Sequence, residues 1–257
     1  MTCRSETEGA VIAYEELTIE GRNAVIEAFR SGKTIDRVFI LDNCQDGPIM
    51  TIKREAKKTD CLIKYVSRER LDQMSETGKH QGVIAYAAAY EYAQVEDMLK
   101  LAEERQEPPF LILLDNIEDP HNLGAIIRTA NLAGAHGVII PKNRAVGLTA
   151  TVARTSAGAL NYTPVAKVTN LVKTMDELKK KGMWFVCADM DGTRMYDLNL
   201  TGAIGLVIGN EGEGVGRLVK ENCDFVASIP MKGNIDSLNA SVAAGVLAYE
   251  IVRQRLI

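Results

Sequence analysis

The chain has 257 residues, enough for one large domain or two of medium size. Hydrophobic residues make up 46% of it and charged residues 25%, as is usual for a soluble, packed protein. No apolar stretch reaches the ~18 residues of a membrane-spanning helix, and the N-terminus lacks the basic and apolar regions of a secretory signal. The sequence therefore predicts neither a membrane protein nor a secreted one.

Cysteine and histidine usage indicates reduced thiols and no metal site. The cysteines are scattered, odd in number and form no Cys-x-x-Cys pair, so a disulfide framework is not expected. The histidines show no spacing typical of zinc ligands. We therefore expect a cytoplasmic protein that binds no metal ion. The residues concerned are Cys3, Cys44, Cys61, Cys187, Cys223, His80, His121 and His136.

The net charge of −4 at first argues against a polyanionic partner. The acidic excess is confined to two segments, however. Residues 1–19 hold one Arg against four Glu, and residues 93–109 hold two basic against five acidic residues. Binding of a nucleic acid would then depend on a local basic patch, so the charge permits RNA but does not by itself indicate it.

After an acidic tail at residues 1–17, residues 18–92 have the pattern of a small α/β/α domain. Helices are predicted at 22–30, 49–58 and 68–76, and strands at 35–41, 61–66 and 82–89. A charged, helix-compatible stretch that ends in Pro108-Pro109 follows. We therefore take residues 93–109 as the linker.

Residues 110–257 continue the alternation of strands and helices. The run Phe-Leu-Ile-Leu-Leu at 110–114 is apolar throughout, as is typical of a strand buried on both faces of a parallel sheet. Further strands are predicted at 137–140, 163–168, 183–188, 203–208 and 225–229, and helices at 124–133, 149–160, 171–181, 215–222 and 240–256. The chain is therefore predicted to be a parallel α/β protein with two domains.

The first motif, Asn122-Leu-Gly-Ala-Ile-Ile-Arg128, follows the strand at 110–114 and enters a predicted helix. At ~100° per residue the two polar side chains lie about 240° apart, so they cannot share a helix face. They converge only if Asn122 precedes the first turn and Arg128 projects from the second. The alternative is a plain N-cap at Asn122 with a surface charge at Arg128.

The second motif, Ile208-Gly-Asn-Glu-Gly-Glu-Gly214, follows an apolar strand, and its glycines let the backbone approach a ligand closely. It is not a P-loop, since no Gly-Lys-Ser/Thr follows, and it is not a dinucleotide-binding fingerprint. The carboxylates of Glu211 and Glu213 would repel a nucleotide phosphate but tolerate an aminoacyl or sulfonium ligand. A flexible surface turn is the alternative.

The third motif lies in the segment from Ile229 to Asn239, which connects the last strand to the last helix. Ser237 or Asn239 could cap that helix, but two cap-type residues around Leu238 exceed what one cap requires. The helix is rich in Ala, Ser and Gly, which permits close packing against another helix or a second subunit. Its larger apolar residues are expected in the core: Val242, Val246 and Tyr249.

These motifs, in this order, resemble the SpoU/TrmH family of RNA ribose 2′-O-methyltransferases, over nearly the whole chain from about Thr18. Residues 18–92 resemble the family's L30e-like RNA-binding extension through Glu20-Gly-Arg-Asn-Ala-Val25 and Lys79-His-Gln-Gly-Val83. Residues 110–257 resemble its SPOUT catalytic domain, which implies a parallel sheet with a trefoil knot. The family also implies a homodimer.

The resemblance implies S-adenosylmethionine as the cofactor, held in the knot loops mostly through backbone atoms. The family's cofactor contacts fall on Gly209, Ile229, Met231 and Leu238. Its catalytic polar positions fall on Asn122, Arg128, Glu211, Ser237 and Asn239.

The implied chemistry is activation of a ribose hydroxyl beside an RNA phosphate. Arg128 matches the residue to which the family assigns proton removal or phosphate anchoring. Because the pKa of a free guanidinium lies above ~12, we expect Arg128 to orient the hydroxyl and the phosphate rather than to act as a base. Glu211 and Asn122 are expected to hold Arg128. Ser237 and Asn239 are expected to support the loop and the ribose.

Functions from different classes compete. The leading one is S-adenosylmethionine-dependent 2′-O-methylation of a guanosine in large-subunit (23S) rRNA, with a guanosine of tRNA as the alternative substrate. A ribosome-assembly factor that binds RNA without catalysis fits the complete polar set less well. A nucleotide-dependent dehydrogenase would need a fingerprint that the sequence lacks.

Overall fold

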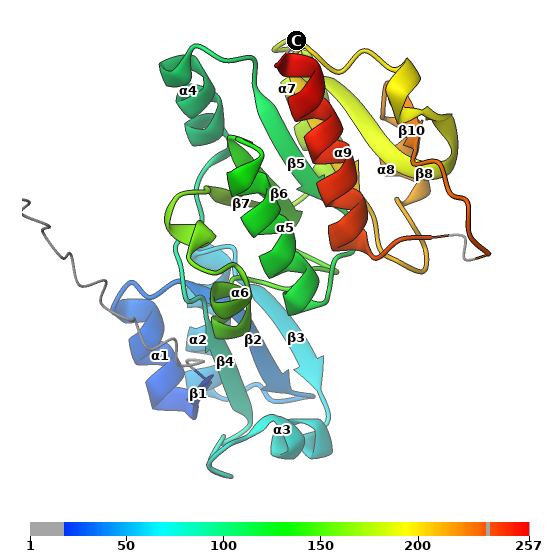
Figure 1. The fold of residues 1–257 in the computed structure, drawn as a ribbon. Helices are drawn as coiled ribbons and strands as arrows, with labels where there is room; N and C mark the ends of the chain where they lie inside the picture. The colour runs from blue at the N-terminus through cyan, green and yellow to red at the C-terminus, as the bar shows by residue number, and fades with distance from the viewer. Residues whose placement is uncertain (1–17, 235–236, 257) are drawn as a thin grey trace, which may run out of the picture.

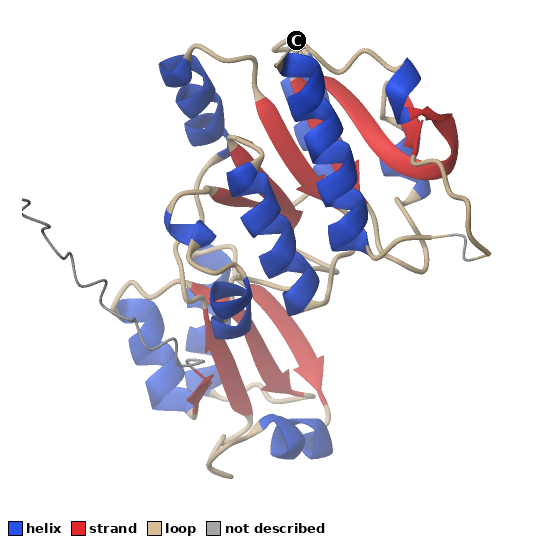
Figure 2. Ribbon diagram, viewed as in Figure 1, coloured by secondary structure: helices blue, strands red, loops and turns tan. Residues whose placement is uncertain are grey.

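The computed structural model describes residues 18–234 and 237–256, so the predicted acidic tail at residues 1–17 lies outside the described residues. Figures 1 and 2 show two domains, with the N-terminal domain below the C-terminal one. Within the described part of the chain, no helix is both long enough and apolar enough to cross a membrane.

The N-terminal domain combines a mixed sheet with flanking helices. Its elements are β1 (Thr18–Glu20), α1 (Arg22–Arg30), β2 (Ile35–Leu41), α2 (Gly47–Lys58), β3 (Leu62–Val66), α3 (Arg68–Met74) and β4 (Val83–Ala87). The sheet order is β1-β4-β2-β3, with β2 and β3 parallel and β4 antiparallel to both β1 and β2. Helices α1 and α2 pack together and bury a core that includes Val25, Val38 and Ile52.

Residues 93–109, expected as a linker, contain helix α4 (Val95–Arg105). Met98 of this helix is fully buried against the sheet of the C-terminal domain. The fit is close, because a Cβ added to Gly137 would lie 2.3 Å from the Met98 sulfur. The helix ends at Gln106, which has a left-handed φ of 57°, just before the prolines. The charged segment thus packs onto the C-terminal domain.

The C-terminal domain holds a six-stranded sheet in which all paired neighbours are parallel. Its elements are β5 (Phe110–Leu114), α5 (Pro120–Leu132), β6 (Gly137–Pro141), α6 (Ala150–Thr155), η1 (Ala159–Asn161), β7 (Val165–Val168), α7 (Leu171–Lys179), β8 (Trp184–Arg194), η2 (Met195–Asp197), β9 (Ile204–Ile208), α8 (Arg217–Glu221), β10 (Phe225–Ser228) and α9 (Ala240–Arg255). The strand order is β10-β8-β9-β5-β6-β7.

Two cores cover the two faces of this sheet. Strand β5 is buried along its whole length, and its side chains alternate: Phe110 and Ile112 face one core and Leu111 faces the other. Helices α5, α6 and α9 cover the first face, and α4, α7 and α8 cover the second (Figure 2). The prediction of a parallel α/β fold is confirmed for this domain, whereas the N-terminal sheet is mixed, since β4 runs antiparallel to β1 and β2. The trefoil knot stays a prediction.

Some element boundaries differ from the sequence prediction. Helix α5 begins at Pro120 rather than near 124, because the Asp119 side chain caps it and proline fits a first turn. The helix expected at 149–160 ends at Thr155, since Ala157 and Gly158 adopt left-handed φ values of 49° and 85°. Strand β8 continues beyond the predicted end at 188, and its distal part pairs with β10.

Helix α9 buries its small residues and exposes part of its larger ones. Ala240, Ala244 and Ala248 lie in the core of the face shared with α5. Val242 and Tyr249 are 48% and 51% exposed, so their expected place in the core is wrong. The alanines let α5 and α9 approach each other closely. Val242 and Tyr249 lie outside this contact and therefore face outward.

Candidate active site

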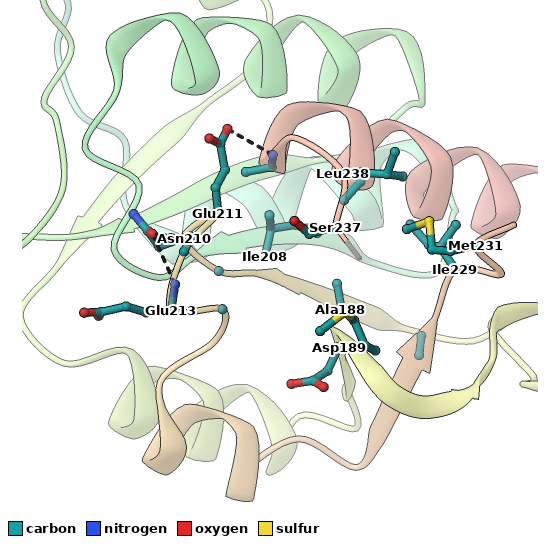
Figure 3. Close-up of a pocket in the computed structure, with 17 residues that line it drawn as sticks. Ala188, Asp189, Ile208, Asn210, Glu211, Glu213, Ile229, Met231, Ser237 and Leu238 are labelled. Carbon is teal, nitrogen blue, oxygen red and sulfur yellow. Dashed lines mark hydrogen bonds between the residues drawn. The ribbon is translucent and has the colours of Figure 1, made fainter. Parts of the chain in front are cut away.

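The middle of β8 and the carboxyl ends of β9 and β10 meet at a pocket of about 250 Å³ (Figure 3). This edge of a parallel sheet is where loops gather and ligands bind. The residues expected at the cofactor all line the pocket: Gly209, Ile229, Met231 and Leu238. Two residues of the expected catalytic set, Glu211 and Ser237, line it as well.

The glycine-rich loop after β9 is a closed turn. Asn210 and Gly214 exchange backbone hydrogen bonds of 3.1 and 2.8 Å, and the Asn210 side chain accepts from the N–H of Gly212 at 2.8 Å. Gly209 has no room for a side chain, because a Cβ there would lie 2.2 Å from the backbone of Gly214. Gly214 has a φ of 68°, which favours glycine. The loop is therefore a hydrogen-bonded turn in which two glycine positions admit no larger residue without strain or a clash.

A polar network joins the motifs beside the pocket. The Asn122 amide donates to Oε1 of Glu211 at 2.8 Å, and the Asn239 amide donates to Oδ1 of Asn122 at 2.9 Å. Asn239 also donates to Glu211. The N–H of Ala240 donates to the same carboxylate at 3.3 Å, which is the dashed line at Glu211 in Figure 3. Glu211 thus lies at the N-terminus of α9, where a negative charge is favourable.

Two of these side chains, Asn122 and Asn239, lie at the starts of helices. Asn122 is not the cap of α5, because Asp119 caps it by accepting from the N–H of His121 at 2.9 Å. Asn122 instead lies inside the first turn and is 9% exposed, so the N-cap interpretation is wrong, as is its expected place before the helix. Asn239 does cap α9, accepting from the N–H groups of Ser241 and Val242. Its amide group remains available for the network.

Arg128 does not join this network. It projects from the middle of α5 into solvent, and among the described residues it makes no hydrogen bond or ion pair. The expectation that Glu211 and Asn122 hold Arg128 is therefore wrong within one chain, since both bind Asn239 instead. The physical reason is the spacing of about 240° around the helix, which points Arg128 away from Asn122.

Asp189 is a residue of this pocket that the sequence reasoning missed. It follows the buried part of β8 and accepts a hydrogen bond of 2.6 Å from Lys220 of α8. That hydrogen bond holds the pKa of Asp189 below its ordinary value, which keeps the carboxylate charged. A signal was present in the sequence: an acidic residue soon after an apolar strand, at the same sheet edge as the motif loops.

The pocket is acidic. Its described lining contains Asp189, Glu211 and Glu213 but no Lys or Arg. Such a lining favours a cationic ligand over one that carries phosphate groups. Over the described ranges, no group of three or more His, Cys, Asp or Glu residues is arranged to hold a metal ion.

Both domains match known sequence families. The profile of the SpoU rRNA Methylase family matches residues 109–249, and that of the RNA 2′-O ribose methyltransferase substrate-binding domain matches residues 18–93. The chain therefore belongs to the SpoU family of RNA methyltransferases, as the motifs had indicated.

Similar proteins extend over most of the chain. YacO of Bacillus subtilis (strain 168), named as a member of the TrmH family of tRNA/rRNA methyltransferases, is 52% identical over 238 residues, which are 91% of this chain and 94% of YacO. An AdoMet-bound rRNA methyltransferase from Sinorhizobium meliloti has the same fold, with a TM-score of 0.57 and 23% identity over 92% of this chain and 86% of its own. The A. aeolicus TrmH/SpoU tRNA modifying enzyme is 30% identical, with a TM-score of 0.53, over 63% of this chain and 84% of its own.

Proposed function

We propose that this chain transfers the methyl group of S-adenosylmethionine to a ribose 2′-hydroxyl in RNA. The observation that carries the proposal is the meeting of the Asn122–Glu211–Asn239 network with the pocket at the carboxyl edge of the sheet. The match of the N-terminal domain to a substrate-binding family of ribose methyltransferases supports the ribose as the acceptor.

The pocket suits S-adenosylmethionine in its charge. The sulfonium is a cation, and the carboxylates of the lining favour it, whereas they would repel the phosphates of ATP or NAD. When bound, the cofactor supplies an electrophilic methyl group. The S. meliloti relative, which shares the fold, is solved with AdoMet bound. The residues proposed to hold the cofactor are Gly209, Ile229, Met231 and Leu238.

The chain's own side chains must orient the ribose and its phosphate, because positioning is a large part of the rate of such a transfer. Arg128 presents a planar fork of donors that suits a phosphate. Ser237, exposed at the pocket, can hydrogen-bond the ribose. Glu211 binds Asn239 and the N–H of Ala240, and so holds the first residues of α9 beside the pocket.

The proposal includes a homodimer. The side chains of Val242 and Tyr249 on α9 are exposed, and so is that of Leu132, one helical turn from Arg128 on α5. Helices α5 and α9 lie side by side in Figure 1. A second copy bound to this face would bury the apolar side chains. It would also supply contacts for Arg128, which makes no hydrogen bond or ion pair to the described residues of its own chain.

Within RNA, we propose a guanosine of large-subunit (23S) rRNA as the substrate, with a tRNA guanosine as the second candidate and the cytoplasm as the place of reaction. The rRNA methyltransferase of S. meliloti aligns with 92% of this chain, including the N-terminal domain, whereas the A. aeolicus tRNA enzyme aligns with 63%. The difference in coverage favours rRNA.

Titration calorimetry tests the cofactor part of the proposal. S-adenosylmethionine or S-adenosylhomocysteine should bind the purified protein with a Kd of ~1 μM, or about −8 kcal/mol. Heat on addition of NAD or ATP, with none for either sulfur ligand, would overturn the assignment.

A further inference from the structure

An ion pair is buried between the two domains. Asp36, at the start of β2, pairs with Lys167 of β7, and their side chains are only 9% and 11% exposed. The Lys167 ammonium also lies 3.5 Å from the carbonyl oxygen of Asp36. In the described part of the chain, no other ion pair has both side chains buried to this degree.

Tyr92 binds to both sides of this ion pair. Its hydroxyl donates to Oδ1 of Asp36 at 2.7 Å and accepts from the N–H of Leu148 at 3.0 Å. The Lys167 ammonium lies 5.1 Å from the centre of the Tyr92 ring, within reach of a cation–π interaction. Tyr92 lies between β4 and α4, in residues 88–94, which connect the two domains. Both domains and this connection therefore meet in one cluster.

The C-terminal domain leaves just enough space for the Asp36 carboxylate. A Cβ added to Gly147 would lie 1.8 Å from Oδ2 of Asp36, so no other residue fits at this position without moving the carboxylate. The neighbouring Arg37 donates to the carbonyl oxygen of Ala145 at 3.1 Å. The contact therefore depends on shape as well as on charge.

The connection itself has little freedom. The N–H of Ala88 donates to Thr34 of the N-terminal domain at 2.9 Å, and the next N–H, of Ala89, donates to Leu148 of the C-terminal domain at 2.8 Å. Ala93 then donates to Val165 at the edge strand β7 at 2.9 Å. The chain is thus fixed to both domains before Tyr92 and to the C-terminal domain directly after it.

The energetics of a buried ion pair favour one arrangement rather than high stability. Removing two charges from water costs several kcal/mol per ion, so the net stabilisation by such a pair is small. A rotation of the N-terminal domain that opens this contact would leave each buried charge without its partner. Interfaces between domains of one chain otherwise permit relative motion.

We propose that Asp36, Lys167 and Tyr92 are positioning residues that lock the N-terminal domain in one orientation relative to the cofactor pocket. The lock sets the distance from the RNA-binding domain to the pocket, and so selects which ribose of a folded RNA reaches the methyl group. This role rests on the proposed function for its RNA substrate, but the orientation itself does not.

The test measures the distance between the domains and the kinetics in the same full-length variants. Spin labels carried by noncanonical amino acids at the exposed positions Lys57 and Lys173 report the distance distribution, with labelled protein diluted into unlabelled protein. The wild type should give one narrow distribution. Lys167→Met should broaden it, whereas Lys167→Arg, which keeps the charge, should not. Lys179→Met, which removes a 2.8 Å ion pair within the C-terminal domain, is the matched control and should stay narrow.

The kinetic result expected for Lys167→Met is a higher KM for a large-subunit rRNA transcript. If only about a tenth of the molecules keep the competent orientation, the apparent affinity for RNA falls ~10-fold, while the Kd for S-adenosylmethionine changes less than ~2-fold.

The apolar double variant Asp36→Leu/Lys167→Met distinguishes an effect on domain orientation from an effect on stability alone. It should recover the wild-type Tm and still show a broad distance distribution.

Two results would overturn the proposal. One is a narrow distribution with wild-type KM in Lys167→Met. The other is recovery of both Tm and the narrow distribution in the apolar double variant, which would make the cluster an ordinary part of the interface. If the wild type methylates no RNA, the proposed function is wrong. The distance distributions still test whether Asp36, Lys167 and Tyr92 fix the orientation of the domains.

Discussion

At the scale of single residues, Arg128 is the side chain on which the proposed chemistry depends most. We expect Arg128→Ala to abolish methyl transfer, while the fold and the affinity for S-adenosylmethionine stay near those of the wild type. Arg128→Lys should also be slow, because a point charge does not replace a planar, bidentate fork. The measurements are methyl transfer to RNA, thermal unfolding and cofactor titration on the same preparations.

Arg105→Ala is the matched control for Arg128. Arg105 is another exposed arginine on a helix of the same domain, so its removal should change stability by no more than about 0.5 kcal/mol and leave the rate intact. Activity retained by Arg128→Ala would make Arg128 a surface charge and nothing more.

A second residue-scale prediction concerns the charge of the pocket. Asp189→Asn removes a negative charge from the lining and from the 2.6 Å contact with the Lys220 ammonium. Binding of the cationic S-adenosylmethionine should weaken ~10-fold, about 1.4 kcal/mol, and binding of S-adenosylhomocysteine, which lacks the sulfonium charge, should weaken less. Calorimetry with both ligands measures the difference. Asp191→Asn, at an exposed position outside the lining, is the control, and equal losses for both ligands would contradict the role of charge.

At the scale of elements, Glu20 fastens the turn that follows α3. Its carboxylate accepts hydrogen bonds of 2.6 Å from both the Ser75 hydroxyl and the N–H of Glu76, and Thr77 donates to it as well. Desolvation raises the pKa of Glu20, but these hydrogen bonds outweigh it and hold the pKa at about 2, below the usual 4.5. The turn therefore gains stability from the ionised form of Glu20.

The sign of the pH dependence follows from this lowered pKa. The stabilisation by Glu20 is complete above the unfolded pKa of 4.5 and is lost as the pH falls toward about 2. Glu20→Gln should therefore lower the free energy of unfolding by about 1–2 kcal/mol at neutral pH, and the gap to the wild type should shrink in acid. Urea unfolding of both proteins between pH 7 and pH 3 measures it. A gap that stays constant over this range would show that the charge of Glu20 contributes nothing.

Local patterns in the sequence predicted most elements and missed the features that depend on distant contacts. The apolar runs gave β5 and β9, and the helix predicted at 22–30 matches α1, because each of these signals is local. The early start of α5 was missed although Asp119-Pro120 is itself a start signal. The outward turn of Val242 could not be predicted, because it depends on how closely α5 approaches α9.

In the candidate site, the sequence predicted which loops meet but not which side chains bind each other. Its loops follow apolar strands, so their convergence at one sheet edge follows from a parallel sheet. The partner of Glu211 was predicted wrongly, because hydrogen bonds between residues 122, 211 and 239 leave no periodic signal in the sequence. The cluster of Asp36, Tyr92 and Lys167 had no motif to mark it for the same reason.

At the scale of the whole molecule, the exposed apolar face of α5 and α9 predicts self-association. We expect the wild type to sediment as a dimer and Tyr249→Glu to sediment as a monomer with reduced methyl transfer, because a charge would replace an apolar contact that the second copy buries. Lys173→Glu, an exposed change on α7 across the sheet, is the control. A monomeric wild type that methylates RNA at full rate would contradict the dimer.

The most direct measurement is transfer of radiolabelled methyl groups from S-adenosylmethionine to RNA taken from cells that lack the protein, followed by digestion to nucleosides and mapping of the modified position. We predict label in a 2′-O-methylated guanosine at one position of large-subunit rRNA, and none with Arg128→Ala. Label in a base instead of a ribose, or no label in any RNA, would contradict a ribose 2′-O-methyltransferase.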